Sequence, residues 1–82
     1  PKKYLVRVFG STPYTSKAVE RPLRASSLDS GGVFILFSNY PMVWCGGRST
    51  GDAREASRRL APTTAPLISE GKEDDDFWSQ LG

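Results

Sequence analysis

The run Val33–Phe37 constrains the fold of this 82-residue chain more than any other feature of its sequence. Its side chains are apolar without interruption, which predicts a central strand that is covered on both faces. The turn-forming sequence Asp29-Ser-Gly-Gly precedes the run. Residues 38–45 are expected to form a hairpin turn and the returning partner strand. A Gly-Gly pair at residues 46–47 then allows the chain a sharp exit from the sheet.

Three further segments have the composition of strands. Residues 4–9 are rich in β-forming side chains, and residues 66–70 form a short apolar segment. Residues 17–20 predict a short strand in which Val19 is the clearest inward candidate. This strand is expected to end at Pro22, because proline has no N–H group to donate to a strand ladder.

The segments between the strands carry turn signals. Gly-Ser-Thr-Pro at residues 10–13 predicts one turn, and Gly71 predicts another after the last strand. The connector at residues 23–28 contains two leucines, Leu23 and Leu28, which are expected to tuck under the sheet.

The apolar period changes to that of a helix over residues 50–60. Three apolar residues recur at helical spacing and predict its inner face: Ala53, Ala56 and Leu60. Ser49 or Thr50 is placed to cap the first turn. The pair Ala61-Pro62 is expected to end the helix.

Residues 74–81 predict a short final helix with acids at its start and Phe77, Trp78 and Leu81 on its apolar side. Strands followed by a helix, a strand and a helix predict an α+β domain. Four aromatic side chains are expected to pack in the core or between sheet and helix: Phe34, Trp44, Phe77 and Trp78.

The composition excludes several kinds of chemistry. The chain has no histidine and one cysteine, so it has no Ser-His or Cys-His pair, no thiolate zinc cluster and no internal disulfide. It has no glycine-rich phosphate loop. A net charge of +2 is too small to imply nucleic acid by itself. No apolar run approaches the ~18–20 residues of a membrane span, and no signal-peptide pattern is present.

Carboxylates alone can catalyse, and Glu70 together with residues 73–76 supplies five of them. The run at residues 73–76 reads instead as the start of a helix. The chain is therefore predicted not to be an enzyme. Its single thiol, Cys45, follows Trp44 in a strand and is expected to be buried and structural. One cysteine fits a reducing, cytoplasmic setting, with a secreted protein as the alternative.

Motifs along nearly the whole chain resemble, in order, a gelsolin-homology domain of the gelsolin/villin family. The similarity is greatest to the fifth of the six domains in villin-type proteins. The resemblance implies one gelsolin-like domain over residues 1–82, with a mixed sheet of about five strands between one longer and one shorter helix. The segments that carry it are Lys17-Ala-Val-Glu, Arg24-Ala-Ser-Ser-Leu, Val33-Phe-Ile-Leu, Trp44-Cys-Gly, Gly51-Asp, Arg54-Glu, Glu70-Gly, Phe77-Trp and Leu81-Gly.

The resemblance also implies a function. The parent protein is expected to be a villin-like, cytoskeletal actin-binding protein that caps, severs or bundles filaments, often under calcium control. Actin is then the partner of the parent protein, and neighbouring gelsolin-like domains are partners of this one. Two alternatives stay open: an intramolecular scaffold without direct actin contact, and a module that binds anionic lipid such as phosphoinositide.

The sequence departs from the family pattern at its calcium site. The resemblance places a backbone carbonyl at Gly31, a carboxylate where Gly32 stands, and a second carboxylate where Ala53 stands. Calcium takes about 6–8 oxygen ligands, several of them charged, so a degraded site and no cofactor are expected. Retained calcium binding is the alternative, with the acids of residues 73–76 as remaining candidates. At the start of the last helix Asp74 replaces a common proline, which is expected to leave that start less fixed.

Basic side chains are the candidate contacts for actin or lipid. Arg54, Arg58 and Arg59 are expected on the exposed side of the long helix. Lys2, Lys3 and Arg7 are weaker candidates for a phosphoinositide patch. A solvated charged face without a partner is the alternative for all of them.

Overall fold

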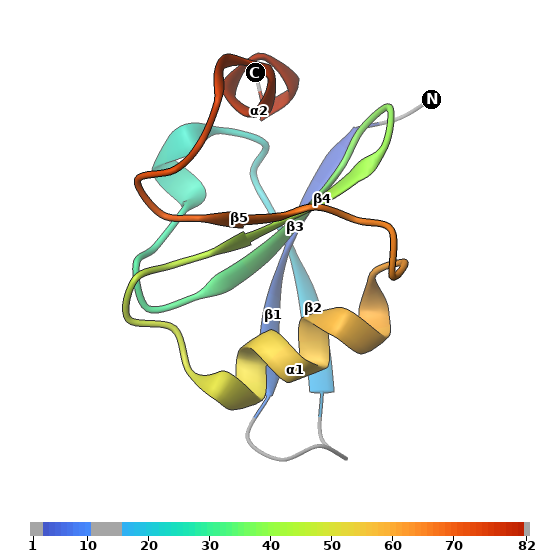
Figure 1. The fold of residues 1–82 in the computed structure, drawn as a ribbon, viewed down its shortest axis with the longest axis vertical. Coiled ribbons are helices and arrows are strands. Elements are labelled where there is room, and N and C mark those ends of the chain that lie inside the picture. The colour runs from blue at the N-terminus through green and yellow to red at the C-terminus, as the bar shows by residue number, and fades with distance from the viewer. Residues whose placement is uncertain (1–2, 11–15, 82) are drawn as a thin grey trace.

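The computed structural model describes residues 3–10 and 16–81 of the chain. These residues form a five-stranded sheet with one α-helix on each face (Figure 1). The strands are β1 (Tyr4–Gly10), β2 (Ser16–Arg21), β3 (Val33–Phe37), β4 (Pro41–Cys45) and β5 (Leu67–Ser69). The helices are a 3-10 turn, η1 (Ala25–Ser27), and the α-helices α1 (Gly51–Leu60) and α2 (Asp75–Leu81). The turn expected at residues 10–13 lies, apart from Gly10, outside the described residues.

The strand order is β2-β1-β3-β4-β5, so β3 lies in the middle of the sheet as its apolar run predicted. It pairs antiparallel with β1 and with β4, and Phe34 lies opposite both Arg7 and Trp44. The edge strand β5 runs parallel to β4. Parallel neighbours need a long crossover connection, and α1 provides it. The α+β mixed sheet between a longer and a shorter helix is therefore confirmed.

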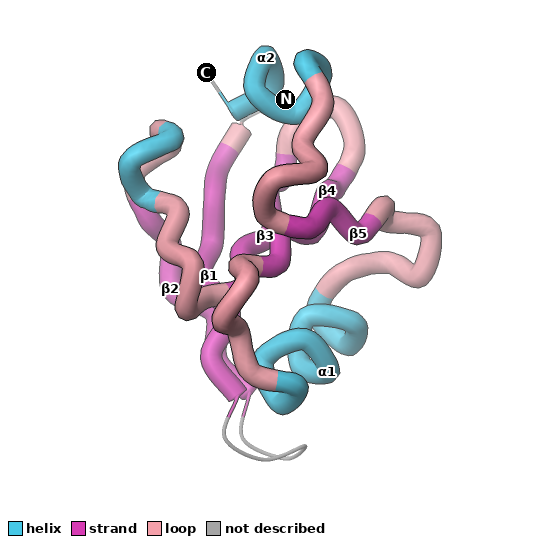
Figure 2. The backbone as a smooth tube through the Cα atoms, turned by 60° about the vertical axis from the view of Figure 1, so that its left-hand side comes forward, coloured by secondary structure: helices cyan, strands magenta, loops and turns pink. Residues whose placement is uncertain are grey.

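The core is divided by the sheet into two clusters, because successive side chains of a strand point to opposite faces. Figure 1 shows α2 above the sheet and α1 below it, and the turned view of Figure 2 keeps them on opposite sides. The cluster on the α2 face contains Leu5, Phe34, Leu36, Met42, Trp44, Phe77 and Leu81. The cluster on the α1 face contains Val8, Val33, Ile35, Val43, Ala53, Ala56 and Ala61.

The aromatic prediction is confirmed for Phe34, Trp44 and Phe77, which are buried. It is wrong for Trp78, which is 41% exposed and lies edge-on to Phe77. In a helix of seven residues, Phe77 and Leu81 are one turn apart and take the inward stripe. Trp78 is rotated by ~100° from Phe77 and turns toward solvent.

The long helix begins after Thr50, whose hydroxyl accepts a hydrogen bond from the N–H of Ala53 at 3.1 Å. Ala53 and Ala56 are buried as predicted, but Leu60 is 42% exposed, so this part of the prediction is wrong. Ala61, just after the helix, joins the core instead. Ser57 is fully buried and donates its hydroxyl proton to the carbonyl of Arg54 at 2.6 Å, which satisfies a polar group on the inner face.

Small side chains let α1 approach β1 closely. A Cβ on Gly10 would lie 2.8 Å from the carbonyl oxygen of Asp52 and 3.0 Å from the Cβ of Ala56.

The connector before β3 packs less completely than predicted. Leu28 packs against the α2-face cluster, but Leu23 is 37% exposed because η1 turns the chain at the open edge of the sheet.

Candidate functional site

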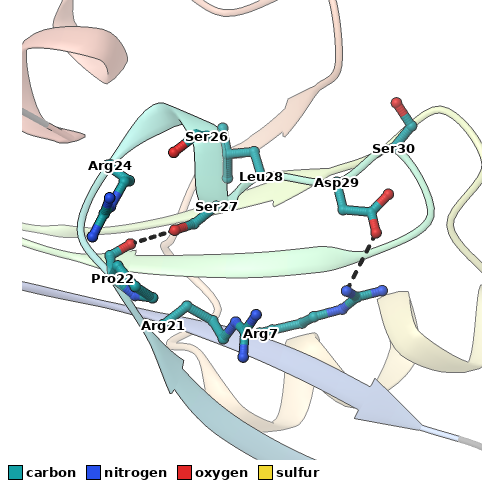
Figure 3. A pocket seen from close by; sticks show the side chains of 9 residues that line it. All are labelled: Arg7, Arg21, Pro22, Arg24, Ser26, Ser27, Leu28, Asp29 and Ser30. Atoms are coloured by element: carbon teal, nitrogen blue, oxygen red, sulfur yellow. Dashed lines mark hydrogen bonds and ion pairs between the residues drawn. The ribbon is translucent and has the colours of Figure 1, made fainter.

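The turn before β3 is held by an arginine from β1. Nη1 of Arg7 lies 3.4 Å from Oδ2 of Asp29 (Figure 3). The other carboxylate oxygen of Asp29 accepts a hydrogen bond from the N–H of Gly31 at 3.0 Å. The backbone carbonyl of Asp29 accepts a second one from the N–H of Gly32 at 2.9 Å. The Gly31 N–H and the charge of Arg7 together hold the pKa of Asp29 below its ordinary value.

Arg7 is enclosed more than a surface arginine normally is. Its guanidinium carbon lies 5.0 Å from the ring centre of Phe9 and 5.6 Å from that of Phe34, which are cation–π distances. Its side chain is 25% exposed. Its Nε atom is buried and has no hydrogen-bond partner. Arg7 was expected to extend a lipid-binding patch with Lys2 and Lys3. Its side chain is turned onto the sheet, and its role in such a patch stays a prediction. Lys2 lies outside the described residues.

The expected calcium-site positions do not form a set of calcium ligands. A Cβ on Gly32 would lie 2.9 Å from Nε of Arg7 and 3.0 Å from the ring of Phe34, so a side chain there would meet a fixed cation. Ala53 is buried on the α1 face beside Val33, whereas Phe34 faces α2. A side chain at position 32 would lie on the α2 face, next to Phe34, whereas the side chain at position 53 lies on the α1 face. Calcium does not fit these residues, since it requires several converging oxygens.

Among the described residues, no group of three or more Asp, Glu or Cys side chains is arranged to hold a metal ion. Calcium independence itself stays a prediction, because it is a property of binding in solution.

The carboxylate of Glu70, which the sequence places at a strand end and among the acids considered for catalysis, holds three loops together. Glu70 accepts hydrogen bonds from the hydroxyl of Ser30 at 2.6 Å and from the N–H of Gly47 at 2.7 Å. These two donors lower its pKa. The loops cross so closely that a Cβ on Gly46 would lie 2.2 Å from the carbonyl oxygen of Ser30. Glycine is therefore required at position 46 by contact between backbones, whereas a Cβ on Gly47 would meet only the Glu70 side chain, at 3.2 Å.

The acids before α2 make structural contacts. Glu73 accepts a hydrogen bond from Nε1 of Trp44 at 2.7 Å and another from the N–H of Gly71 at 3.0 Å. Asp74 accepts one from the N–H of Phe77 at 2.9 Å and so caps the helix. Capping is therefore confirmed for Asp74, whereas Glu73 joins the turn at Gly71 to Trp44. The expectation that Asp74 loosens the helix start is wrong, because its carboxylate satisfies a free N–H group that proline would leave unpaired.

The basic side chains of α1 are exposed, as predicted. Arg54 and Arg58 line one cavity of about 330 Å³ between α1 and the β4–β5 edge, together with Cys45 and Glu70. The Nε atom of Arg54 donates to the hydroxyl of Ser49 at 3.1 Å. Arg59 is exposed on the same helix but does not line this cavity.

Cys45 is half-buried at this cavity, so the prediction that it is a buried thiol is only partly right. Burial raises the pKa of its thiol, and the charges of Arg54 and Arg58 oppose that shift without reversing it. A neutral thiol is the result, which suits a structural role.

A larger cavity of about 740 Å³ lies at the opposite edge of the sheet, and the sequence reasoning missed it. Arg7, Arg21 and Arg24 line it. No motif marks these arginines as a group, since only the strand register and the turn of η1 bring them together.

Neither α-helix in the described part of the chain is long and apolar enough to cross a membrane.

No protein-family model matches the chain. Individual proteins do match it over nearly its full length. It is 38% identical over 80 residues to the villin-like protein quail of Drosophila melanogaster. It is 34% identical over 87 residues to advillin of Mus musculus, and 30% identical over 84 residues to cytoplasmic gelsolin of Homarus americanus.

These alignments cover 95%, 100% and 95% of this chain, but only 9%, 11% and 11% of the relatives. The chain therefore spans about a tenth of the length of the curated relatives that it matches.

Two solved structures share the fold. The Thorarchaeota 2DGel3/rabbit actin complex gives a TM-score of 0.77 at 23% identity, covering 98% of this chain and 45% of that chain. The Thorarchaeota ProGel/rabbit actin complex gives 0.78 at 21% identity, covering 99% of this chain and 100% of that one.

Proposed function

Because this chain is a domain of the gelsolin and villin family, we propose that it is an actin-binding module of a longer, villin-like protein. The parent protein caps, severs or bundles actin filaments in the cytoplasm as part of the cytoskeleton. The observation that carries the proposal is identity of 30% to 38% with villin- and gelsolin-type proteins over almost the whole chain. The two fold neighbours were both solved as actin complexes, which supports the same partner.

The domain is non-enzymatic, like the gelsolin- and villin-type proteins that it matches. Its contribution to the parent protein is therefore binding. Residues 1–82 act as one gelsolin-like unit, in the position of the fifth domain of a villin-type chain, and its neighbours are further gelsolin-like domains.

Contact with actin is made through the exposed side of α1. Arg54 and Arg58 are four residues apart and project from the same side of the helix, while Ala53 and Ala56 hold the other side against the sheet. Arg59 extends the positive charge along the helix. A basic face of this kind attracts an acidic partner, and salt weakens the attraction.

The domain binds without calcium. The guanidinium of Arg7 lies next to Gly32 and pairs with Asp29. A fixed cation at that position repels a calcium ion and occupies the carboxylate of the turn. The module is therefore a constitutive contact, and any calcium control of the parent protein resides in its other domains.

Cosedimentation of the chain with filamentous actin tests this proposal. We expect sedimentation at low ionic strength that weakens as salt is added and does not change when a chelator removes calcium. Absence of sedimentation at low ionic strength would contradict direct contact and leave the domain as a scaffold that positions its neighbours. Sedimentation with phosphoinositide vesicles but not with actin would assign the basic face of α1 to anionic lipid instead.

A further inference from the structure

The cavity lined by Arg7, Arg21 and Arg24 lies at the β2 edge of the sheet, away from the basic face of α1. Its arginines come from three separate places: the middle of β1, the last residue of β2, and the turn before η1. Figure 3 shows Arg21 reaching toward Arg7, with Arg24 on the far side of Pro22.

Strand register explains why two of these arginines are neighbours. Leu5 lies opposite Arg21 and Arg7 lies opposite Val19, so Arg7 and Arg21 share a face as a diagonal cross-strand pair. Like charges at such positions repel each other unless an opposite charge lies between them. The register therefore places two positive charges side by side at this edge of the sheet.

The hydrogen-bonding capacity of the cavity is largely unused. In the described part of the chain, the side chains of Arg21 and Arg24 have no hydrogen-bond or ion-pair partner. The Nε atom of Arg7 is buried without a partner, and its contact with Asp29 is long for a charge-assisted hydrogen bond at 3.4 Å. The hydroxyl of Ser26, on η1, is also unpaired within the described residues and lines the cavity.

The charge balance of the cavity is positive. Among the described residues that line it, three arginines oppose a single aspartate, Asp29. Asp29 is held at one end of the cavity by Arg7 (Figure 3). Within residues 3–10 and 16–81, the guanidinium groups of Arg21 and Arg24 have no such counter-ion.

We propose that this cavity binds the phosphate group of a small, soluble phosphorylated molecule. Guanidinium groups present a planar fork of N–H donors that matches a phosphate oxygen pair, and a serine hydroxyl supplies a further donor. The depression over these residues is open to solvent and has a volume of about 740 Å³, which leaves room for a phosphate group. This site is separate from the proposed actin contact, and neither depends on the other.

Inorganic pyrophosphate is the probe that tests the site. We expect the chain to bind it at low ionic strength by isothermal titration calorimetry, and the affinity to fall as salt is added. The double variant Arg21→Gln with Arg24→Gln removes the two unpaired guanidinium groups and keeps the Arg7–Asp29 pair. It should bind pyrophosphate about a hundredfold more weakly, because each charge-assisted hydrogen bond to phosphate strengthens binding by about tenfold.

The matched control is Lys17→Gln with Lys72→Gln, which removes the same charge from exposed positions outside the cavity. It should bind like the original chain. Failure of the chain to bind pyrophosphate, or equal weakening in both double variants, would overturn the proposal, the second because it would indicate nonspecific charge attraction. Circular dichroism confirms that both variants are folded.

Vesicles containing phosphatidic acid separate the two sources of the phosphate group. Pyrophosphate binding that needs Arg21 and Arg24, without sedimentation on the vesicles, supports a soluble ligand. Sedimentation on the vesicles that needs the same two arginines, with no binding of pyrophosphate, would overturn the soluble source and assign the cavity to a lipid headgroup.

Discussion

The guanidinium of Arg7 lies against Gly32, and a Cβ added to Gly32 would come within 2.9 Å of its Nε atom. The glycine and the arginine are therefore linked: the missing side chain leaves the space that the guanidinium fills. The same guanidinium neutralises Asp29 in the turn and lies over the rings of Phe9 and Phe34. An internal, permanent cation thus stands beside a position where the family resemblance implies a calcium-binding carboxylate.

The thermal stability of the chain should not respond to calcium. A ligand of micromolar affinity at thousandfold excess would stabilise the native state by ~4 kcal/mol. Differential scanning calorimetry with millimolar calcium and with a chelator measures the effect. Equal melting temperatures are expected, and an increase of several degrees in calcium would contradict the prediction.

Trp44→Ala should largely unfold the domain. Trp44 is 3% exposed, packs edge-on to Phe34 and donates a hydrogen bond to Glu73. Truncation of a buried tryptophan costs ~3–5 kcal/mol, which approaches the whole stability of a small domain. Trp78→Ala is the control, because Trp78 is 41% exposed and its truncation should lower the free energy of unfolding much less. Urea unfolding of both variants measures these free energies. Similar decreases in the two variants would mean that the packing described for Trp44 is wrong.

Gly46→Ala should destabilise the domain by ~1–3 kcal/mol, because the new Cβ would collide with backbone that cannot move aside. The carbonyl oxygen of Ser30 is only 2.2 Å from its position. Gly51→Ala makes the same chemical change at the first residue of α1, where nothing lies within 4 Å. That variant should be neutral or slightly stabilising, since alanine restricts the unfolded chain. Chemical denaturation of the pair measures the difference, and a neutral Gly46→Ala variant would count against the loop crossing.

Glu70→Gln should make the stability of the chain less dependent on acid. The pKa of Glu70 in the folded state is below its ordinary value of 4.5. Its contribution is therefore fully present above about pH 4.5 and is lost as the pH falls through the lower folded-state pKa. The difference in urea midpoint between the original chain and the variant should shrink as the pH is lowered through this window. A constant difference would mean that the carboxylate charge is not the stabilising feature.

Replacing Arg54 and Arg58 with glutamate should abolish sedimentation with actin and leave the fold intact. Both side chains are exposed, and exposed charges contribute little to stability. Cosedimentation measures the first effect and circular dichroism the second. Undiminished sedimentation of the folded variant would place the actin contact elsewhere on the domain.

The sequence by itself determined the order and the type of the elements. An uninterrupted apolar run between turn signals favours a strand that is covered on both faces, and Val33–Phe37 is that central strand. Thr50 and the Ala61-Pro62 pair bounded α1, because capping and proline chemistry act on neighbouring backbone groups. Such local signals act through a few adjacent residues and can therefore be recognised from the sequence alone.

The tertiary structure alone decided which side chains meet. Strand register placed Arg7 beside Gly32 and Arg21 beside Arg7, and neither pair is close in sequence. Burial was decided in the same way: Ser57 is enclosed and Leu60 exposed, although helical spacing alone favoured Leu60. The reason is physical, because the period of a helix or strand specifies a face, whereas only the elements packed against that face determine what covers each residue and what charge it meets.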